Sequence, residues 1–471
     1  MENGKIENKK THWYEWMPNS FVLLFLIIVF MTILTYVIPA GMFDRVEKAG
    51  RMVVNPETFH RVDQSPVGLW AMFKSLPQGM VAAAIYIVNI LIAGAMMKVL
   101  YVSGAIENVL GVSIRKLGVK NDTLVVAVMS IIFVLLGALV GFENSIALVP
   151  IAGMVSMAIG GDMMLGALIA VGGIGTGFAV HPFQPATVGT AHAIAELPMF
   201  SGAALRGLFM AMAAVIVMFH NLAYLKRIKK DPEKSLSKDI DTEGFSLSKP
   251  LEDYHILPMH KIVFGIFVTG ILIFVYGAKT YGWFMVEQVT VFIVIAILCG
   301  LVAGLSPNKI TDTMVQGATV VTGGAIIVGV ARAIQVVMEQ GRIADSIVYY
   351  LSLPLKDVPL IVSGILMTVV HSVINFFIPS GSGQAMATMP IMIPLADIIG
   401  MTRQTAVFAF QMGDGIMNLV VPTLGGLLAM LALLRIPFGR WFRVAFPLAL
   451  KLLVASWIIV VIAVLTHWGP A

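Results

Sequence analysis

The sequence predicts an all-α polytopic membrane protein made of two inverted repeats, each with a re-entrant hairpin and a broken transmembrane helix. Three observations predict this fold class. The 471 residues are 58% hydrophobic and only 12% charged, whereas soluble domains carry about twice that charged fraction. Several apolar runs are long enough to cross a bilayer, which takes about 20 helical residues. Polar motifs interrupt these runs at two places 240 positions apart.

The repeat begins at two glycine-led motifs. Gly141-Phe142-Glu143-Asn144 is matched by Gly381-Ser382-Gly383-Gln384. Further pairs keep the same offset of 240: Pro150 and Pro390, Gly173 and Gly413, Gly175 and Gly415, and Pro182 and Pro422. Repeated, broken apolar segments are typical of secondary transporters, in which the substrate binds at the breaks.

The first apolar run, residues 21–38, follows a basic tail and has no clear small-residue cleavage site. It therefore predicts a retained span with a cytoplasmic N-terminus. The polar stretch 41–78 predicts an extracytoplasmic loop with room for a short hairpin. Residues 81–100 predict the return span, and residues 103–121 predict an interfacial helix on the cytoplasmic side.

Residues 123–140 and 146–159 predict the two arms of the first hairpin. As two full crossings they would place the basic cluster 226–230 outside the cell. As a hairpin entered from the cytoplasm, they leave that cluster inside, where basic loops belong. This topology places Glu143 and Asn144 at a tip deep in the protein, where irregular backbone must be surrounded by protein or water.

The polar residues 224–258 predict a cytoplasmic linker between an N-terminal half, 1–223, and a C-terminal half, 259–471. Residues 262–276 match the first span. An additional crossing at 289–302 has no counterpart in the first half, so it inverts everything after it.

The repeat cores are therefore residues 75–223 and, in the opposite orientation, 315–463. The second hairpin has its arms at 360–379 and 385–399. The broken spans run from 163 to 195 and from 405 to 434, with prolines and glycines at each break. Both halves satisfy the positive-inside rule with one topology.

Two acids lie within the predicted membrane region. A carboxylate there costs a few kcal/mol, so it is usually paired, hydrated or functional. An ion pair that locks the hairpin is the structural alternative for Glu143. Asp414 lies between two glycines, with Asn418 one helical turn later. Together with carbonyls freed around Pro422, these two side chains could coordinate Na⁺ or accept a proton.

The other candidate binding residues are polar side chains at the tips and breaks, and one arginine deep in a span. They are Asn144, Ser145, His181, Gln184, Thr187, Ser380, Ser382, Gln384, Thr423 and Arg332. His181 could titrate near neutral pH or stay neutral and bond a freed carbonyl. His371 and Asn375 share a helix face, where helix-to-helix bonding is an equal alternative. Arg332 could pair with a hairpin acid or bind a carboxylate.

Other functional classes lack their motifs. The net charge of +5 lies mainly in predicted cytoplasmic loops and not in a nucleic-acid-binding run. Neither phosphate-binding glycine loop nor HExxH is present, and Gln411-Met412-Gly413-Asp414 departs from the Gly-x-Gly-Asp motif of intramembrane aspartyl proteases. The single cysteine, Cys299, excludes an intrachain disulfide. We expect a non-enzymatic carrier without a cofactor, driven by a gradient or by exchange.

Two stretches resemble the YfcC family of bacterial inner-membrane carriers. They are residues 380–397, which begin Ser380-Gly381-Ser382-Gly383-Gln384, and residues 409–415 followed by Pro422-Thr423. The family is also described as ArcD-like basic amino-acid antiporters or anaerobic C4-dicarboxylate carriers. The resemblance implies arginine/ornithine-type exchange, an inner-membrane location, and a superfamily whose members often form homodimers.

The sequence departs from the family pattern at two places. Relatives tend to carry Glu-Glu where this chain has Glu143-Asn144, and Asn-Pro-Phe where it has His181-Pro182-Phe183. The first prediction is an amino-acid carrier in which intramembrane acids face a cationic substrate. The alternative is an ion-coupled carrier of C4-dicarboxylates or other small organic acids, bound by helix N-termini and Arg332.

Overall fold

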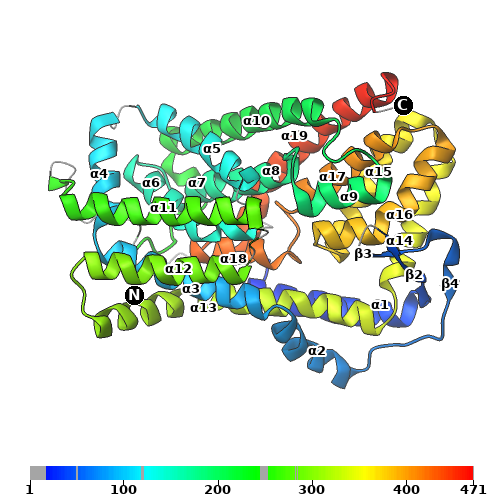
Figure 1. The fold of residues 1–471 in the computed structure, drawn as a ribbon, viewed down its shortest axis with the longest axis horizontal. Helices are drawn as coiled ribbons and strands as arrows, with labels where there is room; N and C mark the ends of the chain where they lie inside the picture. The colour runs from blue at the N-terminus through cyan, green and yellow to red at the C-terminus, as the bar shows by residue number, and fades with distance from the viewer. Residues whose placement is uncertain are drawn as a thin grey trace, which may run out of the picture.

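The computed structural model describes residues 17–48, 51–117, 121–139, 141–243, 245, 253–281, 283 and 285–469. Most of the long helices run along the long axis of the molecule (Figure 1). Helix α13 (Pro307–Gln340) follows one edge, and α10 (Ala203–Lys230) and α19 (Phe438–Leu465) follow the other. The short strands gather at one end of this bundle, and α4 (Ala105–Leu117) lies at the opposite end.

The remaining elements follow in chain order. Those of the first half are α1 (Ser20–Val37), β1 (Gly41–Met42), β2 (Arg45–Lys48), β3 (Arg51–Val54), η2 (Pro56–Thr58), β4 (His60–Arg61), α2 (Leu69–Ala82), α3 (Ala84–Val102), α5 (Asp122–Leu139), η4 (Glu143–Leu148), α6 (Val149–Ala158), α7 (Met163–Ala167), η5 (Leu168–Gly172), α8 (Gly173–Val180), η6 (Pro185–Gly189) and α9 (Thr190–Ala195). The linker and second half contain η7 (Pro232–Lys234), α11 (Pro258–Tyr281), α12 (Met285–Val302), α14 (Ala344–Ser352), η9 (Leu353–Lys356), α15 (Leu360–Phe377), α16 (Gly381–Ile399), α17 (Arg403–Met417) and α18 (Gly425–Leu433).

Nine helical segments of the described chain are long and apolar enough to cross a membrane. They are α1, α3, α5, the run Met163–Val180, α10, α12, α13, α15 and α19. Several leave large apolar side chains on the outer surface, as α1 does with Leu26 (53% exposed) and Tyr36 (59%). Because such a surface is unfavourable in water and favourable in lipid, the prediction of a polytopic helical membrane protein is confirmed.

The segment after α1 contains two short antiparallel sheets. β1 pairs with β4 and β2 pairs with β3, so the predicted loop does contain a hairpin. The prediction of loop up to residue 78 is wrong, because α2 begins at Leu69. Pro77, within the predicted loop, lies inside α2.

Capping side chains define where several helices start. Each accepts a hydrogen bond from a backbone N–H of the first turn, which has no partner within the helix. These capping residues are Asn19 for α1, Asp162 for α7, Ser306 for α13, Ser380 for α16 and Thr402 for α17.

Elements of the two halves recur about 240 residues apart. α5 packs on α8 and α10, and α15 packs on α17 and α19 in the same way. α2 and α3, which are separated at Ala83, correspond to the single helix α13. In the sequence, α12 of the second half occupies the positions that correspond to the strands of the first half.

The outer ends of the first hairpin, α5 with η4 and α6, lie at one end of the bundle. Asp122, at the start of α5, forms an ion pair with Lys229. Asp162, just after α6, accepts a hydrogen bond of 2.8 Å from the hydroxyl of Tyr224. Both partners belong to the C-terminal part of α10, so the two arms meet the same end of that helix.

The outer ends of the second hairpin, α15 and α16, lie at the other end. A Cβ on Gly364 of α15 would lie 2.8 Å from Val460 of α19 and 3.4 Å from Met401, which follows α16. A Cβ on Gly202, just before α10, would lie 2.4 Å from Trp468, just after α19. The C-terminal end of α19 is therefore at the N-terminal end of α10, and the outer ends of the two hairpins lie at opposite ends of the bundle.

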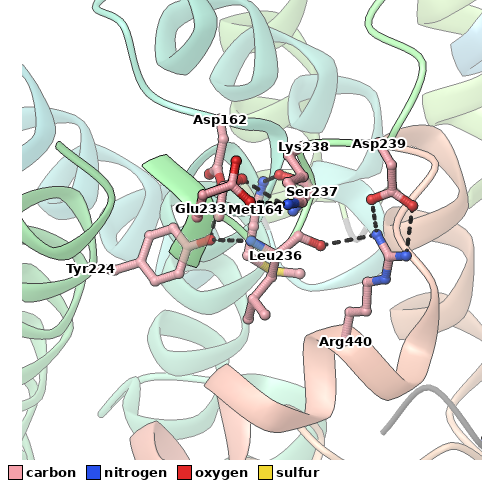
Figure 2. Close-up of polar contacts among 10 residues, drawn as sticks. Asp162, Met164, Tyr224, Glu233, Leu236, Ser237, Lys238, Asp239 and Arg440 are labelled. Atoms are coloured by element: carbon pink, nitrogen blue, oxygen red, sulfur yellow. Dashed lines mark hydrogen bonds and ion pairs between the residues drawn. The ribbon is translucent and has the colours of Figure 1, made fainter. Parts of the chain in front are cut away.

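The linker is tied to the first half through Asp162 (Figure 2). Tyr224 donates to this carboxylate and accepts a 3.2 Å hydrogen bond from the N–H of Leu236. Ser237 of the linker accepts from the N–H of Met164 at 3.0 Å, in the first turn of α7. The beginning of the first broken helix is therefore fixed to the linker.

The same linker segment is tied to the second half through Arg440 of α19 (Figure 2). Arg440 donates to the carbonyl of Leu236 at 3.1 Å and forms a two-point ion pair with Asp239. The neighbouring guanidinium holds the pKa of Asp239 below its usual range. We call residues 235–241 with Asp162, Tyr224 and Arg440 the linker clasp, since it joins one end of both halves.

Candidate functional site

The second broken helix ends where its sequence weakens it. α17 stops at Met417, and helix resumes at Gly425. Pro422 has no N–H, so the carbonyl of Asn418 has no helical donor from that position. Asp414 and Asn418, one helical turn apart, are 1% and 4% exposed. A carboxylate and an amide are therefore buried beside an interrupted backbone.

Asn375 of α15 joins these two side chains. Its amide nitrogen donates to Asp414 Oδ1 at 3.0 Å and to Asn418 Oδ1 at 3.1 Å. Because a carboxylate only accepts, this contact fixes the orientation of the Asn375 amide. The buried Asn375 Oδ1 has no hydrogen-bond partner among the described residues. The atom of Asn375 that stays unpaired is therefore its oxygen, a hydrogen-bond acceptor.

The tip of the second hairpin lies between the two halves. Ser380 accepts from the N–H of Gly383 at 3.3 Å and so caps α16. Next to it, a Cβ on Gly381 would lie 2.3 Å from Thr187 Cγ2 and 3.3 Å from Asp414 Oδ2. Only a glycine fits there without displacement. The tip therefore brings Thr187, from the first break, close to Asp414, from the second.

Gln384, in the first turn of α16, is fully buried. Its amide nitrogen donates to the carbonyl of His371 at 2.9 Å, which leaves Gln384 Oε1 without a partner in the described structure. Thr423 at the second break donates to the carbonyl of Phe376 at 2.8 Å. The second break, α15 and the hairpin tip are therefore held together by side-chain hydrogen bonds to backbone.

The first break separates α8, which ends at Val180, from the helical turn that begins at Pro185. Its freed carbonyls find a donor in the other half of the protein. The Gln411 amide nitrogen, from α17, donates to the carbonyl of Ala179 at 3.1 Å and to that of His181 at 2.9 Å. The end of α8 is therefore held by the second broken helix.

The two broken helices cross at equivalent glycines. A Cβ on Gly175 would lie 2.4 Å from Leu419 Cδ2, and a Cβ on Gly415 would lie 2.5 Å from Ala179 Cα. Positions 175 and 415, like positions 179 and 419, are 240 apart. The contact therefore repeats itself with the halves exchanged, as expected at a pseudo-twofold axis.

Several polar atoms at the breaks and along the second hairpin have no hydrogen-bond partner among the described residues. They are Thr176 Oγ1, His181 Nδ1, Thr187 Oγ1, His371 Nε2, Asn375 Oδ1 and Gln384 Oε1. Buried polar groups are normally paired, since leaving one unpaired costs about 1–3 kcal/mol. These groups at the broken-helix crossing are therefore candidates for binding water, an ion or a substrate.

The tip of the first hairpin lies against α3 and α18. Ser145 is fully buried, and its hydroxyl donates to the carbonyl of Gly141 at 2.6 Å. The rings of Phe142 and of Phe178 in α8 pack in a T-shaped arrangement, with 5.9 Å between the ring centres. The side chains of Glu143 and Asn144 lie outside the described part of the structure, so their predicted binding roles stay predictions.

The other predicted residues occupy more exposed positions. Ser382 and Gln184 are half-buried, and the carbonyl of Gln184 accepts from the N–H of Gly189 at 3.0 Å. His181 is half-buried with its ring against Phe183. Arg332 is exposed on α13, one helical turn after Val328, whose Cα would lie 2.7 Å from a Cβ on Gly425 at the second break.

Three residues at the site had little or no signal in the sequence. In the sequence, Asn375 only shares a helix face with His371, since its partners are 39 and 43 positions away. Gln411 stands out in the sequence only beside Gly413 and Asp414. Arg206 of α10 is fully buried and donates to Gln411 at 3.0 Å. A basic residue inside an apolar run was the one clue to Arg206.

Two curated proteins are similar to this chain over almost its whole length. A Haemophilus influenzae protein of undefined function is 29% identical over 95% of this chain and 97% of its own length. An Escherichia coli K12 protein named "Putative basic amino acid antiporter YfcC" is 28% identical, with 97% of both chains covered. The chain therefore matches these relatives over nearly their full length.

Among solved structures, the Alcanivorax borkumensis YdaH transporter is 17% identical with a TM-score of 0.44, covering 96% of this chain and all of that one. Neisseria gonorrhoeae MtrF, from a class of antimetabolite efflux pumps, is 16% identical with the same TM-score and 96% coverage of both chains. The DcuC family model, described as C4-dicarboxylate anaerobic carrier, matches residues 17–465. This chain therefore belongs to the DcuC family of membrane transporters.

Proposed function

We propose that this transporter is a secondary active carrier of amino acids, of the basic arginine/ornithine type, that works by exchange. The observation that carries the proposal is the chemistry of the second break. The amide nitrogens of Asn375 and Gln384 are both used within the protein, so both leave a buried oxygen without a partner. Together with the Asp414 carboxylate, these atoms favour a positively charged or donating group.

Two kinds of cation could bind at the second break. One is an ammonium or guanidinium group of the substrate, and the other is a coupling Na⁺ or proton. Asp414, Asn418 and the carbonyls freed around Pro422 supply the oxygen ligands that broken helices offer to Na⁺. The name of the Escherichia coli relative supports the amino-acid assignment.

The second candidate is ion-coupled transport of a C4-dicarboxylate or another small organic acid, which the family description favours. The N-terminus of α16, at Ser380 and Gly381, would then offer backbone N–H groups to a carboxylate, while the acceptor cluster would bind the coupling cation. Arg332, exposed on α13, would be the basic side chain that contacts such an acid.

We further infer that both hairpins are re-entrant in a bacterial inner membrane, with the N-terminus in the cytoplasm. The basic C-terminal turns of α10 and the linker clasp lie at the end where the first hairpin enters. The positive-inside rule assigns that end to the cytoplasm. The halves 1–223 and 259–471 would then be the inverted units of alternating access, and the carrier would work as a homodimer.

Counterflow in proteoliposomes tests the substrate. Vesicles loaded with unlabelled ornithine receive labelled arginine or labelled succinate outside, each with Na⁺ or with choline. Arginine entry that depends on internal ornithine is the expected result. Entry of succinate without arginine would overturn the amino-acid assignment in favour of the second candidate. Dependence on Na⁺ would assign the coupling ion.

A further inference from the structure

Arg206 is a buried charge without a counter-charge. It is 0% exposed in α10, and no described carboxylate lies within ion-pair distance of it. Its Nη1 donates to the carbonyl of Ser201 at 2.7 Å, and its guanidinium lies 5.3 Å from the ring centre of Trp468. Its Nε donates to Gln411 Oε1 at 3.0 Å. Because burying an ionised group is costly, its retention inside a membrane span indicates a role.

The contact with Gln411 gives Arg206 a defined effect. An amide presents an oxygen on one side and an NH₂ group on the other. Since Arg206 can only donate, it keeps the oxygen of Gln411 toward itself and turns the NH₂ group toward the carbonyls of Ala179 and His181. A flipped Gln411 would set its oxygen against those two carbonyls, which is repulsive.

The fold does not require this arrangement, because the other half manages without it. The position 240 after Arg206 is Phe446, and the position 240 before Gln411 is Val171. The carbonyl of Leu419, equivalent to that of Ala179, accepts instead from the indole N–H of Trp441 at 2.8 Å. The Arg206–Gln411 pair is therefore specific to the first break.

We propose that Arg206 and Gln411 form a positioning pair that sets the backbone of the first break. Gln411 lies one helical turn before Asp414 on α17, so the pair links the first break to the helix that carries the acid. The inference rests on the proposed function only in assuming that the first break lines the transport site. Arg206 acts through Gln411 and does not itself touch the substrate.

Gln411→Glu tests the pair while keeping an oxygen acceptor for Arg206. A glutamate would pair with Arg206 but could not donate to the two carbonyls, so the protein should fold while the break shifts. We expect normal yield and melting temperature, and an exchange rate lowered about tenfold, as for hydrogen bonds worth about 1.4 kcal/mol. Arg206→Lys should retain most of the rate, because lysine still donates to Gln411, whereas Arg206→Met should not.

A labelling assay provides a readout that does not need a known substrate. Phe183 in the first break is 51% exposed, and Cys299 is the only cysteine of the chain. In a Cys299→Ser background, the maleimide labelling rate of Phe183→Cys should change several-fold on adding Gln411→Glu. The matched control is Thr405→Val, on the same helix, whose hydroxyl contacts Thr402 and not the break; it should leave labelling unchanged.

Equal labelling and equal exchange in Gln411→Glu and the parent would overturn the proposed pair. If the parent protein exchanges neither arginine nor succinate, the substrate assignment fails, while the labelling comparison still decides the role of Arg206 and Gln411. If Gln411→Glu and Thr405→Val change labelling equally, the effect is a general disturbance of α17, and the pair has no specific positioning role.

Discussion

The two breaks interrupt equivalent helices of the two halves, but different side chains donate hydrogen bonds to their freed carbonyls. At the second break, the carbonyl of Leu419 is bonded by Trp441 of its own half. At the first, the equivalent carbonyl of Ala179 is bonded by Gln411 of the opposite half, which Arg206 orients. The carbonyl at the end of the first broken helix therefore depends on a side chain of the opposite half, whereas its equivalent at the second break is bonded within its own half.

The breaks also differ in charge. Asp414 and Asn418 of the second half correspond to Ile174 and Phe178 of the first, 240 positions earlier. The first break offers hydroxyl groups and an imidazole instead, from Thr176, Thr187 and His181. Both halves therefore contain the backbone interruption, but the buried acid, Asp414, belongs to the second broken helix.

Replacing the acid should have the largest effect. Asp414→Asn removes the charge and keeps the size of the side chain. We expect exchange to fall about 100-fold, in line with about 3 kcal/mol for a hydrogen bond to a buried charge. Initial rates of counterflow measure this, with Asp397→Asn as the control because that carboxylate is 43% exposed. Equal loss in both variants would contradict a special role for Asp414.

The equivalent glycines of the crossing should respond unequally. In Gly415→Ala the new methyl group would meet the backbone of Ala179 at 2.5 Å, whereas in Gly175→Ala it would meet the movable end of Leu419 at 2.4 Å. We expect Gly415→Ala to lower the free energy of unfolding by about 1–3 kcal/mol, and Gly175→Ala by less.

Thermal unfolding in detergent compares these two variants. The control is Gly323→Ala, since nothing lies within 4 Å of a Cβ at that position of α13. A melting temperature for Gly175→Ala below that of Gly415→Ala would contradict the closer backbone contact assigned to Gly415.

Thr187→Val separates function from stability at the first break. The Thr187 hydroxyl is buried without a partner, so exchanging it for a methyl group should be neutral or stabilising. If the hydroxyl binds the substrate or its ion, the half-saturation concentration for exchange should rise about three- to tenfold. Unchanged transport would remove Thr187 from the site.

The linker clasp should contribute least. The pKa of Asp239 is lowered by Arg440, so its stabilisation is complete above the unfolded value of about 3.9 and is lost as pH falls through the lower folded value. Because Asp239 is 62% exposed, Asp239→Asn should cost at most about 1 kcal/mol at neutral pH.

Melting temperatures of wild type and Asp239→Asn, followed from neutral to acidic pH, test the clasp. The two curves should converge at acidic pH, where the wild-type carboxyl is protonated. A difference that grows toward acid would contradict the assigned direction of the pKa shift.

Much of the fold could be predicted because its causes are local. A bilayer requires about 20 apolar residues for each crossing, and clusters of glycine and proline weaken a helix locally. The spans, the two breaks and the 240-residue offset followed from these facts. Helix α2 was missed at its start because Pro77, a common loop residue, lies inside it.

The partners of the buried polar groups could not be predicted in the same way. Asp414 stood out in the sequence because charge is rare in membrane spans, but its contact with Asn375 depends on how α15 packs on α17. Arg206 and Gln411 are 205 positions apart, and no periodicity connects them. Hydrophobicity and backbone propensity act along the chain, whereas a hydrogen bond between two helices exists only once packing has brought its donor and acceptor together.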